Sequence, residues 1–583
     1  MSFVAIINSV ENLRMLLAAG ERPLAVGSWS TAVVEAARAA GLPALLEDEV
    51  LDTPTRATIQ AHAERLARAL VPAGVPAHRR YADWAWWALE FPMMYVSAQG
   101  ARTRLLLRAL LESQRAARGI AHDVEGWLQG AVVVLAADEL GIPAFAFQPH
   151  QSWGESVTRR HDFALLPTTQ DGWRPEWRGT PLRRTPQPNV LMIHTNEIAH
   201  LVGALVHPGG RHFTLVQDAR DPWPKPYTGQ AVDAVPQGEL RPLEAPEWPA
   251  GAREVAKPWE RELLDHLFVT WQAHLRDQHA WARAAYDAGR VRLFLGGSDH
   301  LPQMRARLLA CRELGIPTVL VQHGAFLALQ PGRYAQPNHR YADHNLVWSR
   351  AAARELATYL QARGESRVIG WPQAGVAAAK WRRARAAARR HEWVVLPSGT
   401  GTPADAISSY RAADDFLRDV LGAVRAVRPD AHLVVKCHPF SDNVPQVEAL
   451  CAEYGLANAR VVTGLDPWRA LAHAELAIAG VSSAAFSAAA MAVPLVVHAP
   501  GPNRWFGQFA DVTQTTTRAE LEAVLADPAA IRDARSLLRY AREDARAGRR
   551  VVAVLRGLLH PARRPAPPRP RTRVERRRAA RAR

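Results

Sequence analysis

The sequence predicts an α/β protein of two Rossmann-like domains that face an interdomain cleft, with a disordered basic tail at the C-terminus. Short apolar runs alternate with helical segments along most of the chain, which is typical of parallel sheets with helical crossovers. With 583 residues the chain is also too long for a single hydrophobic core, so at least two domains are expected.

The first domain is expected to cover residues 1–344. Residues 153–188 and 218–257 are rich in Pro, Trp and Gly, and we predict them to be loop insertions in this domain. Gly41 and Pro43 end an early helical segment before an apolar run. The expected strands lie at residues 3–7, 23–27, 44–46, 144–147, 189–193, 212–216, 291–295 and 318–321.

A second α/β domain is expected over residues 391–560, after a hinge and linker helix at residues 345–390. The linker helix is strongly basic on one side. Each apolar run of the second domain is short enough for a buried parallel strand. The expected strands lie at residues 393–396, 433–435, 459–462, 476–478 and 495–497.

Composition and charge are those of an ordinary globular protein with a basic end. Hydrophobic residues make up 48% and charged residues 22%. Residues 561–583 hold ten Arg against Glu575, and subtracting their +9 from the total of +16 leaves +7 for the rest. This Pro- and Ala-rich tail is expected to be disordered.

The lack of recognisable targeting signals and the pattern of cysteines favour a cytoplasmic location. The first twenty residues lack a basic leader, and no apolar run reaches the roughly 18–20 residues of a membrane span. Cys311, Cys437 and Cys451 have spacings that fit neither a disulfide framework nor a zinc site.

Lys436 and His438 are candidate phosphate ligands. They follow an apolar run and stand two positions apart, so both side chains can point to one face where the strand ends. Pro439 removes a backbone donor and ends the pairing there. A cation beside an imidazole suits a diphosphate leaving group, on which negative charge builds as the bond breaks. A solvated Lys and a capping His are the other interpretation.

Two polar turns are expected on the same edge of the sheet. Ser482 and Ser483 open an alanine-rich helix, where a serine is either an ordinary N-cap or part of an anion site. Ser398, Gly399 and Thr400 follow the first strand of this domain. That turn lacks the Lys of a P-loop.

His323 is the candidate general base of the first domain. It follows an apolar run, and Gly324 lets the backbone turn sharply beside it. Taken alone, a structural or surface histidine is the more common outcome. Asp299 and His300 are rival candidates on the acceptor side, although Asp299 also fits a helix N-cap ahead of Pro302.

Together, Gln322-His323-Gly324, Lys436-Cys437-His438-Pro439 and Ser482-Ser483 resemble the motifs of GT-B glycosyltransferases of bacterial surface and capsular polysaccharides. Similar families are the CDP-glycerol glycerophosphotransferases, the capsular Kdo transferases and the bacterial sialyl- and polysialyltransferases. They share an HP motif, an SS motif and, in several branches, an HG histidine. The resemblance covers residues 291–559 and is loose before them.

The resemblance implies transfer of a sugar or polyol-phosphate unit from a CMP-, CDP- or UDP-linked donor to a glycan or lipid-linked glycan. His323 would deprotonate the acceptor hydroxyl, and the first domain would receive the acceptor. The donor phosphate would be held by Lys436, His438, Ser482 and Ser483. No cofactor or metal is expected, because such enzymes generally need none and no DxD-type carboxylate pair lies near these motifs.

One position departs from the pattern of these families. Many relatives carry an acidic residue three or four positions after the second serine, often for the ribose hydroxyls. Here Phe486 and Ser487 stand at these positions, so the identity of the nucleotide stays open.

Two other functions remain as alternatives. A non-hydrolysing UDP-sugar 2-epimerase shares the two-domain fold, but its chemistry needs carboxylates in the cleft, and no convincing set is apparent. A non-catalytic binding protein of this fold is the other. The tail lacks interleaved aromatic residues, so no nucleic acid is expected. An anionic membrane surface near a lipid-linked acceptor suits the tail better, which would make the protein peripheral on the inner face of the cytoplasmic membrane.

Overall fold

The computed structural model describes most of the chain. The described residues are 2–7, 10–71, 86–122, 127–146, 169–170, 173–179, 189–192, 198, 201, 204–205, 212–218, 230–236, 240–241, 247–299, 301–322, 324, 328–330, 333–334, 339–358, 362–387, 391–397, 411–437, 444–500 and 507–560. The basic tail, the 398–400 turn, His300, His323 and His438 lie outside these residues.

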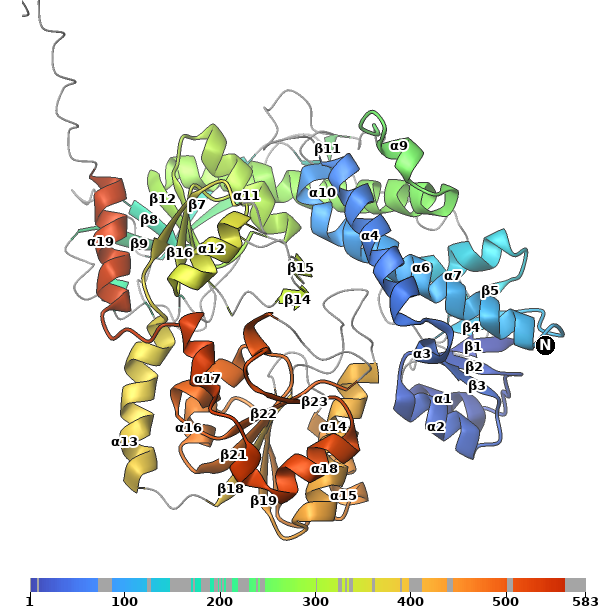
Figure 1. Ribbon diagram of the computed structural model, residues 1–583. Coiled ribbons are helices and arrows are strands. Elements are labelled where there is room, and N and C mark those ends of the chain that lie inside the picture. Colours follow the sequence, from blue (N-terminus) through green and yellow to red (C-terminus); the bar gives the residue numbers. More distant parts are fainter. Residues whose placement is uncertain are drawn as a thin grey trace, which may run out of the picture.

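The described residues form three large, mainly parallel sheets with helical crossovers, and two further sheets of two strands each, which confirms the α/β class (Figure 1). The first is five-stranded and entirely parallel, in the order β3-β2-β1-β4-β5. Figure 1 shows helices α1 and α2 on one face of it and α6 and α7 on the other. Its elements are β1 (Val4–Ile6), α1 (Val10–Ala18), β2 (Val26–Ser28), α2 (Thr31–Ala39), β3 (Ala44–Leu46), α6 (Glu90–Ser113), β4 (Ile120–His122), α7 (Trp127–Glu139) and β5 (Ala144–Ala146).

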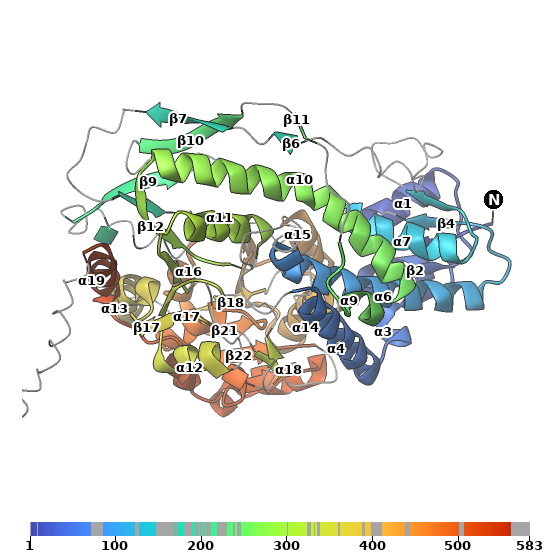
Figure 2. The same cartoon turned by 90° about the horizontal axis from the view of Figure 1, so that it is seen from above.

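The second sheet has eight strands in the order β17-β16-β13-β12-β8-β9-β10-β7 and is parallel except for the β10–β7 pair. Helix α10 begins beside α9 (Ala252–Val255) and α6, next to the first sheet, and runs toward β12 of this sheet (Figure 2). The elements are β7 (Trp173–Gly179), β8 (Asn189–Met192), β9 (Thr214–Asp218), β10 (Gln230–Pro236), α10 (Pro258–Ala288), β12 (Val291–Gly296), α11 (Pro302–Glu313), β13 (Thr318–Val321), β16 (His344–Val347), α12 (Arg350–Thr358) and β17 (Glu365–Val368).

The third sheet has six parallel strands in the order β20-β19-β18-β21-β22-β23. All five strands predicted for this region are confirmed. The prediction succeeds here because short, fully apolar runs are typical of parallel strands that are covered on both faces. The elements are β18 (Glu392–Leu396), α14 (Arg411–Val427), β19 (His432–Lys436), α15 (Val444–Glu453), β20 (Ala459–Val462), α16 (Pro467–Leu471), β21 (Ala474–Ala479), α17 (Ala484–Ala490), β22 (Leu495–His498), β23 (Thr513–Thr515) and α18 (Arg518–Ala526).

The loop prediction for residues 153–188 and 218–257 is wrong in part. Strands β7 and β10 lie in these stretches and pair antiparallel over seven residues each. Strand β7 is the edge of the sheet, where a proline such as Pro175 is tolerated because its missing N–H faces no neighbouring strand. Pro and Trp content therefore gave a misleading loop signal.

The segment expected as a hinge contributes to the second sheet. Strands β16 and β17 extend that sheet beyond β13, and the basic helix α13 (Ala379–Ala387) follows them.

Residues 1–344 also hold two sheets, since the strands from β1 to β5 pair only among themselves in the described residues. Where the chain divides into rigid units stays a prediction.

The last helix returns from the third sheet to the second. Helix α19 (Ala547–Leu559) packs Val551, Val552 and Leu555 into the same core as Leu293 and Leu346 of the second sheet. A Cβ atom added at Gly548 would lie 2.7 Å from the Cβ of Ala204, so this helix approaches closely. The chain thus passes from the second sheet to the third and returns to the second through α19.

A tryptophan cluster connects the second and third sheets, and an ion pair connects the first and third. The Trp348 and Trp371 rings, at the ends of β16 and β17, stack 4.8 Å apart, and Trp468 of α16 lies 5.2 Å from Trp371. All three are buried. The first sheet meets the third through an ion pair of 3.2 Å between Glu35 of α2 and Arg418 of α14.

Among the described residues, no helix combines the length and apolarity needed to cross a membrane. Within the same residues, no group of three or more His, Cys, Asp or Glu side chains is placed to hold a metal ion.

Candidate functional site

Two turns at the carboxyl edges of different sheets meet at one point. Gly324 follows β13 of the second sheet, and Ser483 follows β21 of the third. A Cβ atom added at Gly324 would lie 3.9 Å from the Ser483 Oγ, and Gly324 has a φ of +69° that favours glycine. The two motifs, 159 positions apart in the sequence, are therefore neighbours in space.

Gln322 holds the Gly324 turn in place. This side chain is 1% exposed; its Nε2 donates to the Gly324 carbonyl at 3.0 Å, and its Oε1 accepts from the Trp348 N–H at 2.8 Å. The Gly324 turn is thus tied to the end of the neighbouring strand β16. No role for Gln322 was predicted from the sequence. Its one signal was a polar residue at the end of a buried apolar run.

Lys436 is the last residue of β19 and is half-buried. It pairs with Val462 of β20, and the next residue, Cys437, continues this pairing through a backbone hydrogen bond of 2.9 Å to the Val462 carbonyl. Cys437 is fully buried, like the three residues that precede Lys436 in this strand. Lys436 therefore stands at the carboxyl edge of the third sheet.

Ser482 and Ser483 are half-buried at the start of α17. The Ser482 hydroxyl accepts from the Ala484 N–H at 3.0 Å, whereas Ser483 makes no side-chain capping bond to the helix. The following alanines are buried, because small side chains let the helix lie close to the sheet. Ser483, the serine that caps nothing, is the one that faces Gly324.

Phe486, which stands at one of the two positions where an acidic residue was expected, lies in the hydrophobic core. Its side chain is fully buried and packs edge-on against Phe509, with ring centroids 5.8 Å apart. The neighbouring Ser487 is 4% exposed. Neither position offers a ribose-binding group at the surface.

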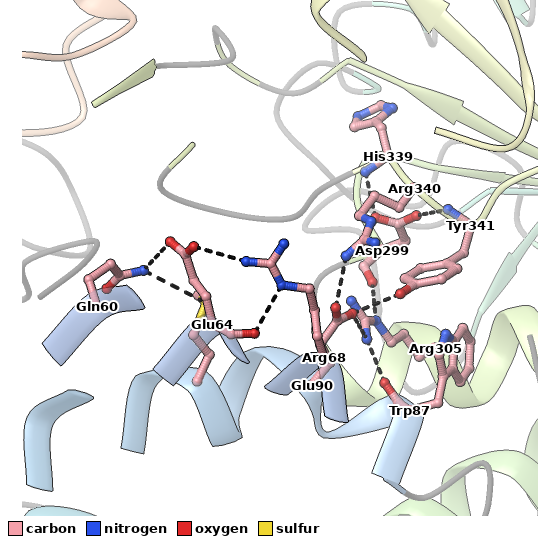
Figure 3. A network of polar contacts seen from close by, with 11 residues as sticks. Gln60, Glu64, Arg68, Trp87, Glu90, Asp299, Arg305, His339, Arg340 and Tyr341 are labelled. Atoms are coloured by element: carbon pink, nitrogen blue, oxygen red, sulfur yellow. Dashed lines mark hydrogen bonds and ion pairs between the residues drawn. The ribbon is translucent and has the colours of Figure 1, made fainter. Parts of the chain in front are cut away.

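Asp299 lies in a buried polar network rather than at an open edge (Figure 3). Its carboxylate accepts from the His339 N–H at 2.5 Å and the Tyr341 N–H at 2.7 Å. Complete burial raises the pKa of Asp299 to about 6, against the opposing charge of Arg305. The geometry gives Asp299 a structural task, which is to orient the turn before β16. Its acceptor role stays a prediction without support from this placement.

Glu90 is the centre of the same network. Its carboxylate accepts from Arg305, Arg340 and the Tyr341 hydroxyl, each at 2.8 Å. Burial alone would raise the pKa of Glu90, but the charges of Arg305 and Arg340 hold it below its usual range. This network joins α6, next to the first sheet, to α11 and the turn before β16.

No protein-family model matches the sequence, and no curated protein matches it. MurG of Acinetobacter baumannii is 13% identical and aligns over 63% of this chain and 99% of its own, with a TM-score of 0.36. MnaA of S. aureus with UDP is 13% identical and aligns over 64% and 97%, with a TM-score of 0.41. The wall teichoic acid polymerase TagF is 10% identical and aligns over 65% and 90%, with a TM-score of 0.38. All three TM-scores are below 0.5.

Proposed function

We propose that this protein is a metal-independent glycosyltransferase or glycerophosphotransferase-like enzyme. It moves a sugar or polyol-phosphate unit from a CMP-, CDP- or UDP-linked donor to a surface polysaccharide acceptor. The observation that supports this most directly is the approach of the Gly324 turn to Ser483. It brings the backbone next to His323 within reach of the serines assigned to the donor.

The proposed reaction divides its tasks between the two sheets. His323 takes the proton from the acceptor hydroxyl, and the oxygen attacks the donor carbon, or the donor phosphorus for a polyol-phosphate unit. The bond to the nucleotide phosphate breaks, and its electron pair leaves with that phosphate. Lys436 and His438, together with the hydroxyls of Ser482 and Ser483, stabilise the charge that develops there.

Gln322 fits this scheme as a positioning residue. Its two hydrogen bonds tie the Gly324 carbonyl, next to the base, to the Trp348 N–H at the end of β16, and a displaced base loses its reach to the acceptor hydroxyl. Gln322→Met keeps the side-chain length but removes both bonds. We expect it to lower kcat with little change in donor affinity, whereas a general loss of stability would lower both.

The test combines nucleotide titration with turnover. CMP, CDP and UDP are titrated first to identify the donor nucleotide, and transfer to a glycan acceptor is then measured with the corresponding donor. His323→Ala is expected to keep nucleotide affinity and lose transfer, while the exposed His473→Ala serves as control. Full transfer activity in His323→Ala would exclude the base assignment. Formation of the ManNAc epimer from UDP-GlcNAc without acceptor would favour the epimerase alternative instead.

The membrane role of the tail is a separate part of the proposal. Residues 561–583 would bring the enzyme to anionic lipid, near a lipid-linked acceptor. A protein truncated after residue 560 is expected to bind phosphatidylserine vesicles more weakly than the full chain at low salt. Equal binding of the two proteins would show that the tail is only a solvated terminus.

A further inference from the structure

The first sheet carries a buried histidine without a partner at its own carboxyl edge. Strand β4 ends at His122, which is 3% exposed, and neither of its ring nitrogens has a hydrogen-bond partner. A buried polar group of this kind calls for an explanation, such as a ligand or an ordered water. Its place in the sheet favours a ligand. The strand order reverses between β1 and β4, and parallel sheets bind ligands outside the carboxyl ends at such a point.

The pairing of the strands shows on which face His122 lies. Ile6 of β1 pairs with His122 on one side and with Gly27 of β2 on the other. A Cβ atom added at Gly27 would collide with Leu110 of α6 and lie 3.3 Å from Leu106 of the same helix. Paired residues of neighbouring strands point to the same face. His122 therefore lies on the face that α6 and α7 cover in Figure 1.

Helix α6 presents a second unpartnered polar group on this face. Gln99 is 5% exposed, and its amide Nε2 has no hydrogen-bond partner. It precedes Leu106 by seven residues, which is two helical turns, so both side chains lie on the same stripe of the helix. Leu106 packs on the sheet core. Gln99 continues this stripe toward the carboxyl edge, because α6 runs antiparallel to the strand β4 that follows it.

Trp29 and the charged residues complete the edge. Trp29 is two positions after Gly27, so it shares the α6 face, and it packs against the same core while remaining partly exposed. Glu47 follows β3 on this face and accepts from Arg102, at 2.9 Å from its Nε, and from Arg56 at 3.1 Å. The two arginines are therefore engaged by a buried carboxylate.

We propose that this edge of the first sheet is a second ligand site, which binds a neutral sugar on Trp29 with hydroxyl contacts to His122 and Gln99. An aromatic face beside a few polar side chains is the common make-up of a pocket for such an amphipathic ring. Burial lowers the pKa of His122 to about 4, so at neutral pH its imidazole is uncharged and offers one donor and one acceptor. A phosphate would need a cation, and the described arginines of this edge are already paired.

This site lies on a different sheet from Lys436 and Ser483, and the inference does not rest on the proposed transfer reaction. The test measures binding of N-acetylglucosamine and methyl α-glucoside to the full chain by saturation-transfer NMR and calorimetry. Gln99→Met and His122→Phe remove the polar groups at nearly constant volume, and His473→Phe is the control. Thermal melts check the fold, and removing an unpaired buried polar group should leave Tm unchanged or higher.

We expect at least a tenfold loss of sugar affinity in Gln99→Met and in His122→Phe, with no change in the control. Titration with CMP, CDP and UDP should give the same result in all four proteins, which separates this site from the proposed donor site. The inference is overturned if neither sugar binds the wild-type chain, which would leave an ordered water as the partner of His122. It is also overturned if both variants bind sugar normally, or if uridine or glucose 1-phosphate binds there in place of a neutral sugar.

Discussion

The two junctions of the second sheet are built from opposite chemistry. Toward the first sheet, Glu90 and Arg305 lie in a buried network of charged and hydrogen-bonded groups (Figure 3). Toward the third sheet, Trp348, Trp371 and Trp468 pack ring against ring. Hydrogen bonds between charged groups require fixed distances and angles, whereas apolar contact is non-directional. Hydrogen bonds between charged groups therefore fix the first junction, whereas packing of buried rings forms the junction beside the Gly324 turn.

The largest loss of stability is expected when one charge is removed from the ionic junction, which is the Glu90 network between the first and second sheets. Arg305→Met leaves the carboxylate of Glu90 buried with only Arg340 as a charged partner, so we expect a loss of about 3–5 kcal/mol in unfolding free energy. Urea unfolding followed by circular dichroism measures it. The exposed pair Arg367–Glu365 is the control, since Arg367→Met should cost about 0–1 kcal/mol. Equal costs would show that the network adds nothing to the junction.

The pH dependence of the ionic junction comes next in size. The pKa of Asp299 is raised from 3.8 to about 6 in the folded protein, so between these values the native state binds more protons than the unfolded state. Stability from this group is then present at pH 4 and lost as pH rises through 6. At about 1.4 kcal/mol per pKa unit the change is about 3 kcal/mol. The unfolding free energy of the wild type minus that of Asp299→Asn should fall by about 3 kcal/mol from pH 4 to pH 7, because only the wild type titrates here. A constant difference would contradict the shift.

The aromatic junction is expected to respond less. Trp371→Phe removes part of a buried ring, which costs about 1–2 kcal/mol, but it also removes an indole N–H that has no partner. Thermal unfolding gives the stability. Limited proteolysis near residues 371–379 tests whether the two sheets separate more easily. A loss as large as that of Arg305→Met would mean that this junction is as specifically packed as the ionic one.

The smallest effect is expected where the first and third sheets touch. Glu35 is about half exposed, so Glu35→Gln should change the unfolding free energy by less than about 0.5 kcal/mol. Urea unfolding at low and high salt checks this. A larger, salt-sensitive loss would show that the first sheet depends on this contact as much as on the Glu90 network.

The sequence predicted the strands of the third sheet well, because their apolar runs are buried on both faces and bounded by clear turns. It failed where strands are short, polar or rich in proline. Glu365–Val368 contains one apolar residue, and as an edge strand it needs few. Local alternation also cannot show which strands pair, so the division of residues 1–344 into two sheets was missed.

For the candidate site, the sequence placed Lys436, Ser482, Ser483 and Gly324 at strand or helix ends, where the structure also has them. It could not show that Gly324 and Ser483 are neighbours, since that contact depends on how two sheets pack. The roles of Gln322 and Asp299 were also beyond it. Both roles depend on hydrogen bonds to backbone groups of residues 2 to 42 positions away in the sequence. The pattern of side chains in the sequence does not reveal such bonds. The roles of His323 and His438 stay predictions.

The return of α19 to the second sheet has a consequence for biosynthesis. Translation delivers residues 189–368 long before residues 547–559, so the core around Leu293 and Leu346 waits for the end of the chain before it is covered. Until then its apolar side chains face water on the ribosome, where chaperones act. The third sheet can form in this interval, because its strands lie between these two stretches. A stop codon just before residue 547 should thus yield a chain whose third sheet is intact while the second aggregates.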